Sequence, residues 1–282
     1  MQKTLVASWL VVALATGLGQ VAPISACADD GPPPSDEPVV TNHQITLQGR
    51  VLKYTARAGF LSLRDEFNQA HGRIFYVYYQ SESGDGKATR PLTFAWNGGP
   101  GSPSSLLHLG ALGPYRAKDP DEYSSPPPPY QLTENESTWL DETDLVLVDP
   151  IGTGYSYPLQ PEFAKEFWSR KGDIDSIAEF IRLFLAHYEY SQGTPILLVG
   201  ESYGTLRAAG VADTLTDKEF NVAGVLLVSP ALDPQGAAAD QQFISLVPSY
   251  TVAAFVHKRL PPDLQDNLES AIRKSENWAL SR

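Results

Sequence analysis

The stretch ILLVGESYGTLRAAGVA, residues 196–212, decides the fold of this chain. Its first four residues form the kind of continuous apolar run that marks a strand covered on both faces. The sequence Gly-Glu-Ser-Tyr-Gly follows at 200–204, and small residues then recur in a predicted helix over 203–212. A buried strand, a tight turn and a helix in succession are typical of an α/β fold, in which such turns lie at the carboxyl end of the sheet.

The rest of the chain repeats this alternation. Apolar or β-prone runs predict further strands at residues 45–63, 73–80, 91–96, 144–148 and 222–228. Gly49 and Gly59 are predicted to divide the first of these runs into antiparallel strands. Apolar residues at helical spacing predict a helix over 174–188. Strands that alternate with helices indicate an α/β class with a mostly parallel sheet and right-handed crossovers.

Composition narrows the function classes. The chain has 282 residues, of which 42% are apolar and 19% charged, and its formal net charge is −12. Such acidity argues against nucleic acid or an anionic membrane as the main partner, because both bind basic faces. One cysteine cannot form an intramolecular disulfide or a zinc cage, and the five histidines are scattered. We therefore expect no metal and no cofactor.

The first 28 residues have the features of an export signal. Lys3 precedes an apolar run over 5–18, which is too short to span a bilayer, and small residues follow at 26–28. Two other interpretations stay open: a lipoprotein signal in which Cys27 is lipidated, and a retained anchor. Residues 29–42 are predicted to be a flexible Pro/Asp-rich linker. The protein is thus expected to be exported to the periplasm or outside, touching membrane only through a lipid at Cys27.

Two glycine-containing turns could carry chemistry. Between a strand and a helix, Gly200-x-Ser202-x-Gly204 predicts a strained turn that presents the serine at the helix N-terminus, where negative charge is favoured. The glycine turn at 97–101 could donate backbone N–H groups to an oxyanion together with Tyr203. The alternatives are an ordinary serine, and a structural or phosphate-binding turn. The phosphate alternative is weak because Pro100 lacks an N–H.

Three blocks, WNGGPGS at 96–102, VDPIGTGYSY at 148–157 and GESYGT at 200–205, resemble signature blocks of the serine carboxypeptidase family, peptidase family S10. They occur in the family's order, and the resemblance extends from about residue 46 to the end of the chain. It implies an α/β-hydrolase fold with a lid-like insertion. It also implies an enzyme that removes C-terminal residues from peptides through an acyl-enzyme, so the expected partner is a peptide with a free C-terminus.

The resemblance also assigns roles residue by residue. It makes Ser202 the nucleophile and places the oxyanion hole at the N–H groups of Gly99 and Tyr203. Asn97 and Glu201 match residues that bind the terminal carboxylate of the substrate. An acid can bind a carboxylate only if one of the two is protonated. A structural role for Glu201 stays open, and residues 152–157 are expected to line the pocket or to form only a turn.

The sequence departs from the family pattern in several places. Ala111 stands where the family often has a glutamate, so Glu201 lacks that carboxyl partner and an acidic pH preference is in doubt. Ser102 stands where many eukaryotic members have a disulfide cysteine. Without paired cysteines, the chain resembles a bacterial branch of the family. The fold orders its triad as serine, acid and histidine. Only His257 follows Ser202, and neither it nor Asp233 is expected to complete the triad.

The sequence therefore predicts an α/β-hydrolase truncated before its last strands. Residues 43–238 would be an incomplete core with an open sheet edge, and residues 239–282 the start of the lid-like helical insertion, ending in an amphipathic helix over 263–280. A serine without a base is a poor nucleophile, so we expect the chain alone to be weak or inactive. The alternatives are an esterase or acyltransferase of the same fold, and a non-catalytic exported lipoprotein or peptide-binding protein.

Overall fold

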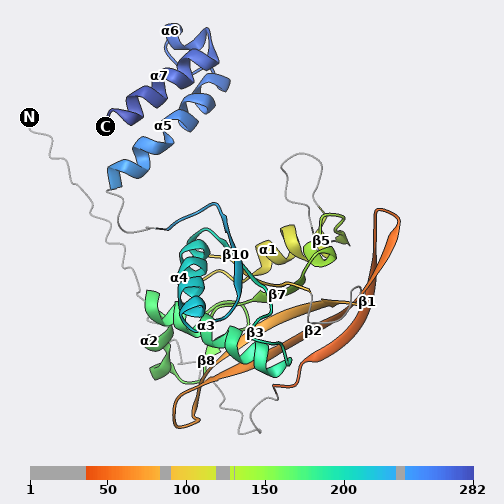
Figure 1. Ribbon diagram of the computed structural model, residues 1–282. Helices are drawn as coiled ribbons and strands as arrows, with labels where there is room; N and C mark the ends of the chain where they lie inside the picture. Colours follow the sequence, from red (N-terminus) through yellow and green to blue (C-terminus); the bar gives the residue numbers. More distant parts are fainter. Residues whose placement is uncertain (1–35, 83–89, 119–127, 130, 233–238) are drawn as a thin grey trace, which may run out of the picture. The chain divides into compact units, whose positions relative to one another are not determined.

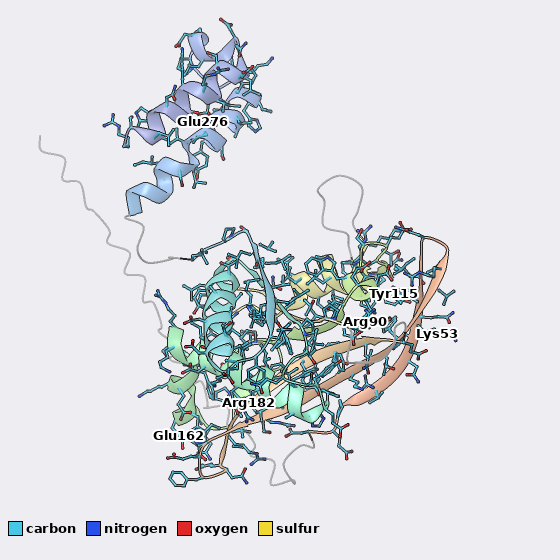
Figure 2. All side chains as sticks on the ribbon, viewed as in Figure 1. Lys53, Arg90, Tyr115, Glu162, Arg182 and Glu276 are labelled. Carbon is cyan, nitrogen blue, oxygen red and sulfur yellow. The ribbon has the colours of Figure 1, made fainter. Side chains whose placement is uncertain are left out.

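The computed structural model describes residues 36–82, 90–118, 128–129, 131–232 and 239–282. The predicted export signal (1–28), Cys27 and Asp233 lie outside these ranges. Described elements run from strand β1 to helix α7 along the chain (Figure 1). Charged side chains such as Lys53, Glu162 and Arg182 are exposed on the outside of the fold (Figure 2).

The N-terminal half of the sheet is a long antiparallel meander. Its three strands are β1 (Val39–Leu47), β2 (Arg50–Arg64) and β3 (Ala70–Ser81). Gly49 lies in the β1–β2 turn as predicted, but Gly59 does not break β2, because β3 pairs with β2 through this position, with Tyr76 opposite Gly59. The linker predicted over residues 29–42 is wrong at its C-terminal end. Residues 39–42 belong to β1, and before them Asp36 forms an ion pair of 2.6 Å with the buried Arg73.

The second half of the sheet is parallel and carries the predicted turns. The sheet order is β1-β2-β3-β7-β4-β9-β10, with β8 (Tyr157–Pro158) also paired to β3. The parallel strands are β7 (Asp144–Val148), β4 (Leu92–Trp96), β9 (Ile196–Glu201) and β10 (Val222–Val228). Every residue of β4 and β7 is buried, as continuous apolar runs predict. The sheet is therefore mixed, and it is parallel only in the half formed by β7, β4, β9 and β10.

One face of the sheet is covered by α3 (Arg170–His187) and α4 (Tyr203–Asp217). Phe180 and Phe184 of α3 and Val211 of α4 pack into the larger hydrophobic cluster with residues of β3, β4 and β9. α3 begins earlier than the apolar spacing predicts, because the Ser169 hydroxyl accepts a hydrogen bond from the Gly172 N–H and caps the helix. Because β9 ends at Glu201 and α4 begins at Tyr203, Ser202 alone connects the strand to the helix.

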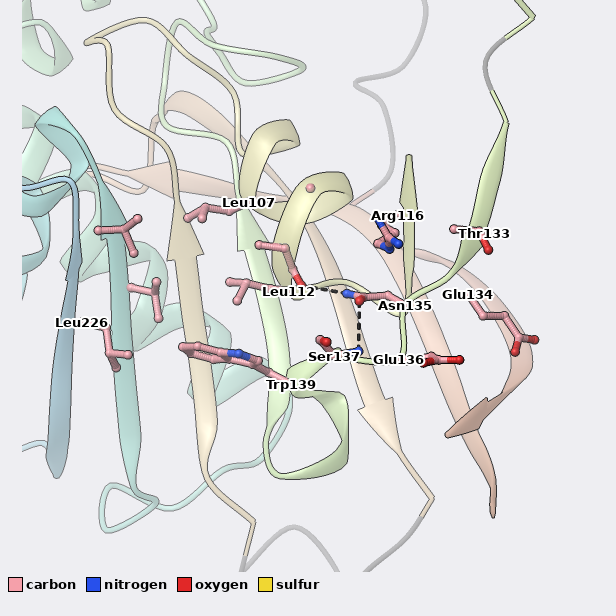
Figure 3. A pocket seen from close by; sticks show the side chains of 14 residues that line it. Leu107, Leu112, Arg116, Thr133, Glu134, Asn135, Glu136, Ser137, Trp139 and Leu226 are labelled. Atoms are coloured by element: carbon pink, nitrogen blue, oxygen red, sulfur yellow. Dashed lines mark hydrogen bonds between the residues drawn. The ribbon is translucent and has the colours of Figure 1, made fainter. Parts of the chain in front are cut away.

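The other face carries short elements. They are α1 (Ser105–Leu107), the π-helix η1 (His108–Leu112), β5 (Tyr115–Ala117), β6 (Leu132–Glu134) and the 3-10 helix η2 (Trp139–Asp141). A cavity of about 740 Å³ lies on this face, between Leu107, Leu112 and Trp139 and the apolar residues of β9 and β10, with Arg116 and Glu134 on its polar side (Figure 3). Leu226 of β10 lines the cavity and is 37% exposed.

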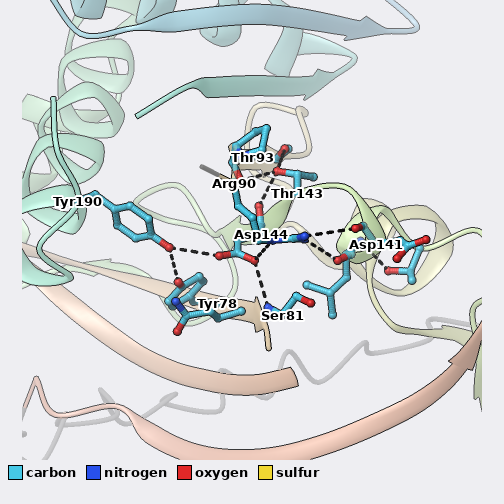
Figure 4. A network of polar contacts seen from close by, with 12 residues as sticks. Tyr78, Ser81, Arg90, Thr93, Asp141, Thr143, Asp144 and Tyr190 are labelled. Atoms are coloured by element: carbon cyan, nitrogen blue, oxygen red, sulfur yellow. Dashed lines mark hydrogen bonds and ion pairs between the residues drawn. The ribbon is translucent and has the colours of Figure 1, made fainter. Parts of the chain in front are cut away.

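The amino end of the parallel strands is held by a buried carboxylate. Asp144 accepts hydrogen bonds from the Ser81 N–H, from Arg90 Nε at 3.1 Å and from the Tyr190 hydroxyl, which also contacts Tyr78 (Figure 4). Burial raises the pKa of Asp144, and the Ser81 and Arg90 contacts oppose that rise. This network lies at the opposite end of the strands from residues 97 and 201.

The remaining described elements precede α3 or follow β10 in the chain. They are η3 (Pro161–Phe163), α2 (Ala164–Phe167), α5 (Ala239–Val256), α6 (Pro262–Gln265) and α7 (Leu268–Leu280). α5 packs against α7. The helix predicted over 263–280 is in fact two helices, because Asn267 caps α7 by accepting a hydrogen bond from the Ser270 N–H. None of the helices among the described residues has the length and apolar character needed to cross a membrane.

Candidate active site

Ser202 lies in a sharp turn between β9 and α4. Its backbone angles are φ 56° and ψ −128°, a combination that non-glycine residues rarely adopt, and its N–H donates to the Val228 carbonyl at 2.9 Å. The turn is so tight that a Cβ on Gly200 would lie 2.0 Å from the Gly204 carbonyl oxygen. The local sequence therefore builds the strained strand–turn–helix that the Gly-x-Ser-x-Gly pattern predicts.

The glycine turn after β4 packs against the first residues of α4. A Cβ on Gly98 would lie 2.5 Å from the backbone nitrogen of Tyr203 and 2.6 Å from the Glu201 carbonyl oxygen. The Trp96 indole N–H donates to the Gly204 carbonyl at 2.9 Å and joins the same two segments. Within the described ranges, no hydrogen bond occupies the backbone N–H of Gly99 or of Tyr203. Both N–H groups are therefore available as donors beside Ser202.

Asn97 and Glu201, at the ends of β4 and β9, lie side by side. The Asn97 amide donates to Glu201 Oε2 at 3.0 Å, and Asn97 Oδ1 accepts a hydrogen bond from the Leu107 N–H at 3.1 Å. Asn97 is 1% exposed, whereas Glu201 is half-buried. The pair therefore presents one carboxylate and one amide next to the serine turn.

Asp149 holds the glycine turn from the β7 side, a role that the sequence analysis did not identify. Its Oδ1 accepts hydrogen bonds from the Ser104 N–H at 2.8 Å and from the Ser104 hydroxyl at 2.9 Å. Its Oδ2 accepts a bond of 3.3 Å from the Tyr155 N–H. The position of an acid at the end of a buried strand, in the block at 148–157, was the available signal.

A cavity of about 240 Å³ opens beside Tyr203. It is lined by Pro100, Gly101, Pro150, Ile151, Gly152, Thr153, Phe167, Trp168, Ser169, Asp173, Tyr203 and Arg207. Gly152 and Thr153 of the predicted pocket-lining segment therefore face a cavity, whereas Tyr155 of the same segment is 69% exposed. Burial, followed by the charge of Asp173, raises the pKa of the Tyr203 phenol.

Within the described residues, no hydrogen bond joins Ser202 Oγ to a histidine, and His257, just after α5, is exposed. His108 instead bonds the Tyr79 hydroxyl at 2.7 Å, and burial lowers the pKa of this histidine to about 4. Across the same ranges, no cluster of three or more histidine, cysteine or acidic side chains is arranged to hold a metal ion. Asn135 is buried, and its amide donates to the Ala111 and Gly113 carbonyls.

A serine in a strained strand–turn–helix, at the carboxyl end of parallel strands covered by α3 and α4, defines an α/β-hydrolase. The sequence model of the serine carboxypeptidase family matches residues 47–277, and the chain belongs to this family. The family predicted from the three sequence blocks is therefore confirmed.

Individual relatives agree with this assignment. The chain is 28% identical over 276 residues to the pheromone-processing carboxypeptidase KEX1 of Tuber melanosporum, a match that covers 95% of this chain and 40% of that protein. It is 25% identical over 207 residues to serine carboxypeptidase-like 36 of Arabidopsis thaliana, covering 72% of this chain and 39% of that protein.

Among solved structures, the fold resembles Kex1(delta)p, a prohormone-processing carboxypeptidase from Saccharomyces cerevisiae. The TM-score is 0.53 at 22% identity, and the match covers 80% of this chain and 48% of that one. At this identity the similarity supports the fold alone. The chain thus spans less than half the length of these relatives.

Proposed function

We propose that this chain carries the nucleophile and the oxyanion hole of a serine-type carboxypeptidase that acts on peptides with a free C-terminus. The observation that carries the proposal is the backbone of Ser202, held at φ 56° and ψ −128° in the turn next to Gly98, together with the N–H groups of Gly99 and Tyr203, which have no acceptor among the described residues. Strain of this kind persists where the surrounding structure enforces it, and it is common at catalytic nucleophiles.

In the proposed reaction, Ser202 Oγ attacks the carbonyl carbon of the last peptide bond. The bond from Oγ to carbon forms as the carbonyl oxygen becomes an oxyanion, which accepts hydrogen bonds from Gly99 and Tyr203. A general base takes the Oγ proton and returns it to the departing amine, so the C-terminal residue leaves and an acyl-enzyme remains. Water then releases the acyl group. One such N–H donor is typically worth about 10²–10³-fold in rate.

Asn97 and Glu201 are proposed to bind the terminal carboxylate of the peptide. The Asn97 amide can donate to it directly, and the Glu201 carboxyl can do so when protonated. The bond of 3.0 Å between the two side chains supports this pairing, because it keeps the amide and the acid on one side of Ser202. A peptide whose C-terminus is amidated should then bind more weakly than the free acid.

A fluorophosphonate probe tests the nucleophile directly. We expect the probe to modify Ser202 slowly in the 282-residue chain, because the described residues place no base beside it, and not at all in a Ser202→Ala variant, with the modified residue identified by mass spectrometry. Hydrolysis of a blocked dipeptide with a free C-terminus, but not of its C-terminal amide, would support a carboxypeptidase. Activity on simple esters with none on either peptide would instead favour the esterase or acyltransferase alternative.

One observation favours a second candidate function, a non-catalytic peptide-binding protein. In the described residues Ser202 has no histidine partner, and a serine hydroxyl without a base reacts slowly. This alternative predicts no labelling of Ser202 together with measurable binding of a free-acid peptide. Calorimetric titration with the free-acid and amidated peptides distinguishes the two candidates. A binding protein gives a binding isotherm with the free-acid peptide and no hydrolysis product.

We also propose that the protein is exported and that residues 239–282 begin a lid-like insertion. The charged, apolar and small-residue segments of residues 1–28 support the first part. The helices α5, α6 and α7 support the second part. Mass spectrometry of the mature N-terminus tests export. A Cys27→Ala variant distinguishes lipidation, which it would abolish, from simple cleavage, which it would leave intact.

A further inference from the structure

A buried ion pair joins helices α3 and α4 next to the candidate site. Arg207 of α4 is 1% exposed, and its Nε lies 2.9 Å from both carboxylate oxygens of Asp173 on α3. Burying two charges carries a large desolvation penalty, and apolar side chains of similar size usually stabilise a fold equally well. The pair therefore calls for an explanation other than stability.

The second contact of Arg207 reaches the glycine turn. Its Nη1 donates to the backbone carbonyl of Asn97 at 2.9 Å. Asn97 is the residue whose side chain bonds Glu201, and it precedes Gly98 and Gly99 in the chain. A guanidinium group is planar and rigid, so one arginine can hold Asp173 and this carbonyl in a fixed relative geometry.

The same pair also holds Tyr203. The Arg207 guanidinium carbon lies 5.3 Å from the centre of the Tyr203 ring, within the range of a cation–π contact. Burial, followed by the charge of the nearby Asp173, raises the pKa of the Tyr203 phenol. The two segments that supply the Gly99 and Tyr203 N–H groups are therefore tied to one ion pair, although they lie about a hundred residues apart in the sequence.

We propose that Arg207 and Asp173 are positioning residues, which hold the 97–101 turn and Tyr203 so that the two N–H groups converge on one oxyanion. This inference rests on the proposed function. Preorganised donors stabilise a transition state because no reorganisation is needed at the moment of reaction. An apolar pair at these positions would fill the same space, but the Asn97 carbonyl would lose its hydrogen-bond donor and the Tyr203 ring its cation–π contact.

The test is a double variant, Arg207→Met with Asp173→Asn, which leaves no buried charge unpaired. We expect it to fold and to melt close to the parent chain. The amide protons of Ser102 and Ser104 report on the turn, because they are bonded to the Gly98 carbonyl and to Asp149. Their hydrogen exchange should accelerate about tenfold or more, and fluorophosphonate labelling of Ser202 should slow by about 10- to 100-fold.

The matched control removes another buried pair, with Arg90→Met and Asp144→Asn at the opposite end of the strands. It should change stability without changing exchange at Ser102 and Ser104 or labelling. If the double variant does not fold, Arg207→Lys replaces it, because lysine keeps the charge beside Asp173 but lacks the fork that reaches Asn97.

The outcomes separate this inference from the proposed function. Unchanged exchange and labelling in the Arg207 variant, or an equal change in the control, would overturn the positioning role. If the parent chain is not labelled, the proposed reaction fails for this chain. The exchange measurement still decides whether Arg207 and Asp173 hold the turn.

Discussion

The contact between the glycine turn and the start of α4 makes a sharp prediction for a Gly98→Ala variant. The added Cβ would lie 2.5 Å from the Tyr203 nitrogen, 2.6 Å from the Glu201 carbonyl oxygen and 2.8 Å from the Gly204 nitrogen. All three are backbone atoms, so no side chain can rotate away. Either the turn or the first turn of α4 must move.

The size of the movement follows from these distances. An ordinary contact begins at 3.4 Å, so the shortest distance falls 0.9 Å short. Overpacking of this kind destabilises a protein by about 1–3 kcal/mol. For a chain of this size that lowers the melting temperature by about 2–4 °C per kcal/mol. A displacement near 1 Å at the proposed oxyanion hole should also slow acylation of Ser202 by about 100-fold.

Two measurements check this prediction. Thermal unfolding reports stability, and the rate of fluorophosphonate labelling reports the geometry around Ser202. Gly110→Ala is the matched control, because its Cβ would meet only Leu106 Cδ1, at 3.8 Å, and should change neither measurement. If Gly98→Ala melts and labels like the parent chain, the close packing of turn and helix is wrong, and the donor geometry proposed from it is wrong as well.

Three further predictions concern other parts of the fold. Because burial lowers the pKa of His108 to about 4, below the 6.5 of an unfolded histidine, the unfolded chain binds a proton that the folded chain does not between these values. The free energy of unfolding should therefore be unaffected by His108 above pH 6.5 and should fall by about 3 kcal/mol as the pH drops to 4. Urea unfolding at several pH values should show a smaller fall in a His108→Gln variant. An identical fall in the variant and the parent chain would contradict a neutral buried histidine. An Asp149→Ala variant leaves the Ser104 N–H and hydroxyl without their acceptor, so it should lower the free energy of unfolding by about 2 kcal/mol. An Asp149→Asn variant should lower it by less, and urea denaturation measures both. Equal losses in the two variants would argue against these hydrogen bonds. β10 is the last strand in the sheet order, and its apolar residues are exposed, so it could pair with a second copy of the chain. A Leu226→Lys variant should then self-associate less in light scattering, with little change in melting temperature. Equal scattering from the variant and the parent chain would contradict a role of this strand in association.

Much of the site could be predicted from the sequence because its determinants are local. The strained turn needs small residues at 200 and 204 and a serine between a buried strand and a helix, all within a few consecutive positions. The same holds for the glycine turn after β4. The apolar runs also predicted β4, β7 and β9, because strands covered on both faces have few polar positions. The run over 222–228 predicted β10 as well, although most of that strand is exposed.

Features that depend on distant partners were missed. Residues 39–42 contain Thr41 and Asn42 and were predicted to be linker, yet they form part of β1 because β2 supplies their backbone partners. Gly59 was predicted to break a strand, but continuous pairing with β3 outweighs its low strand propensity. The start of α3 depends on the Ser169 cap, which apolar spacing does not reveal.

The sequence by itself determined the α/β class, the serine turn and the family, because each rests on short segments whose residue types are dictated by backbone geometry. Only the tertiary structure decided that Asn97 and Glu201 bond each other, that Asp149 holds Ser104, and that Arg207 spans Asp173 and the Asn97 carbonyl. A charged residue in a helix usually faces solvent, so Arg207 gave no sign of burial. Contacts between positions 34 or 110 residues apart arise from packing, and no local pattern encodes them.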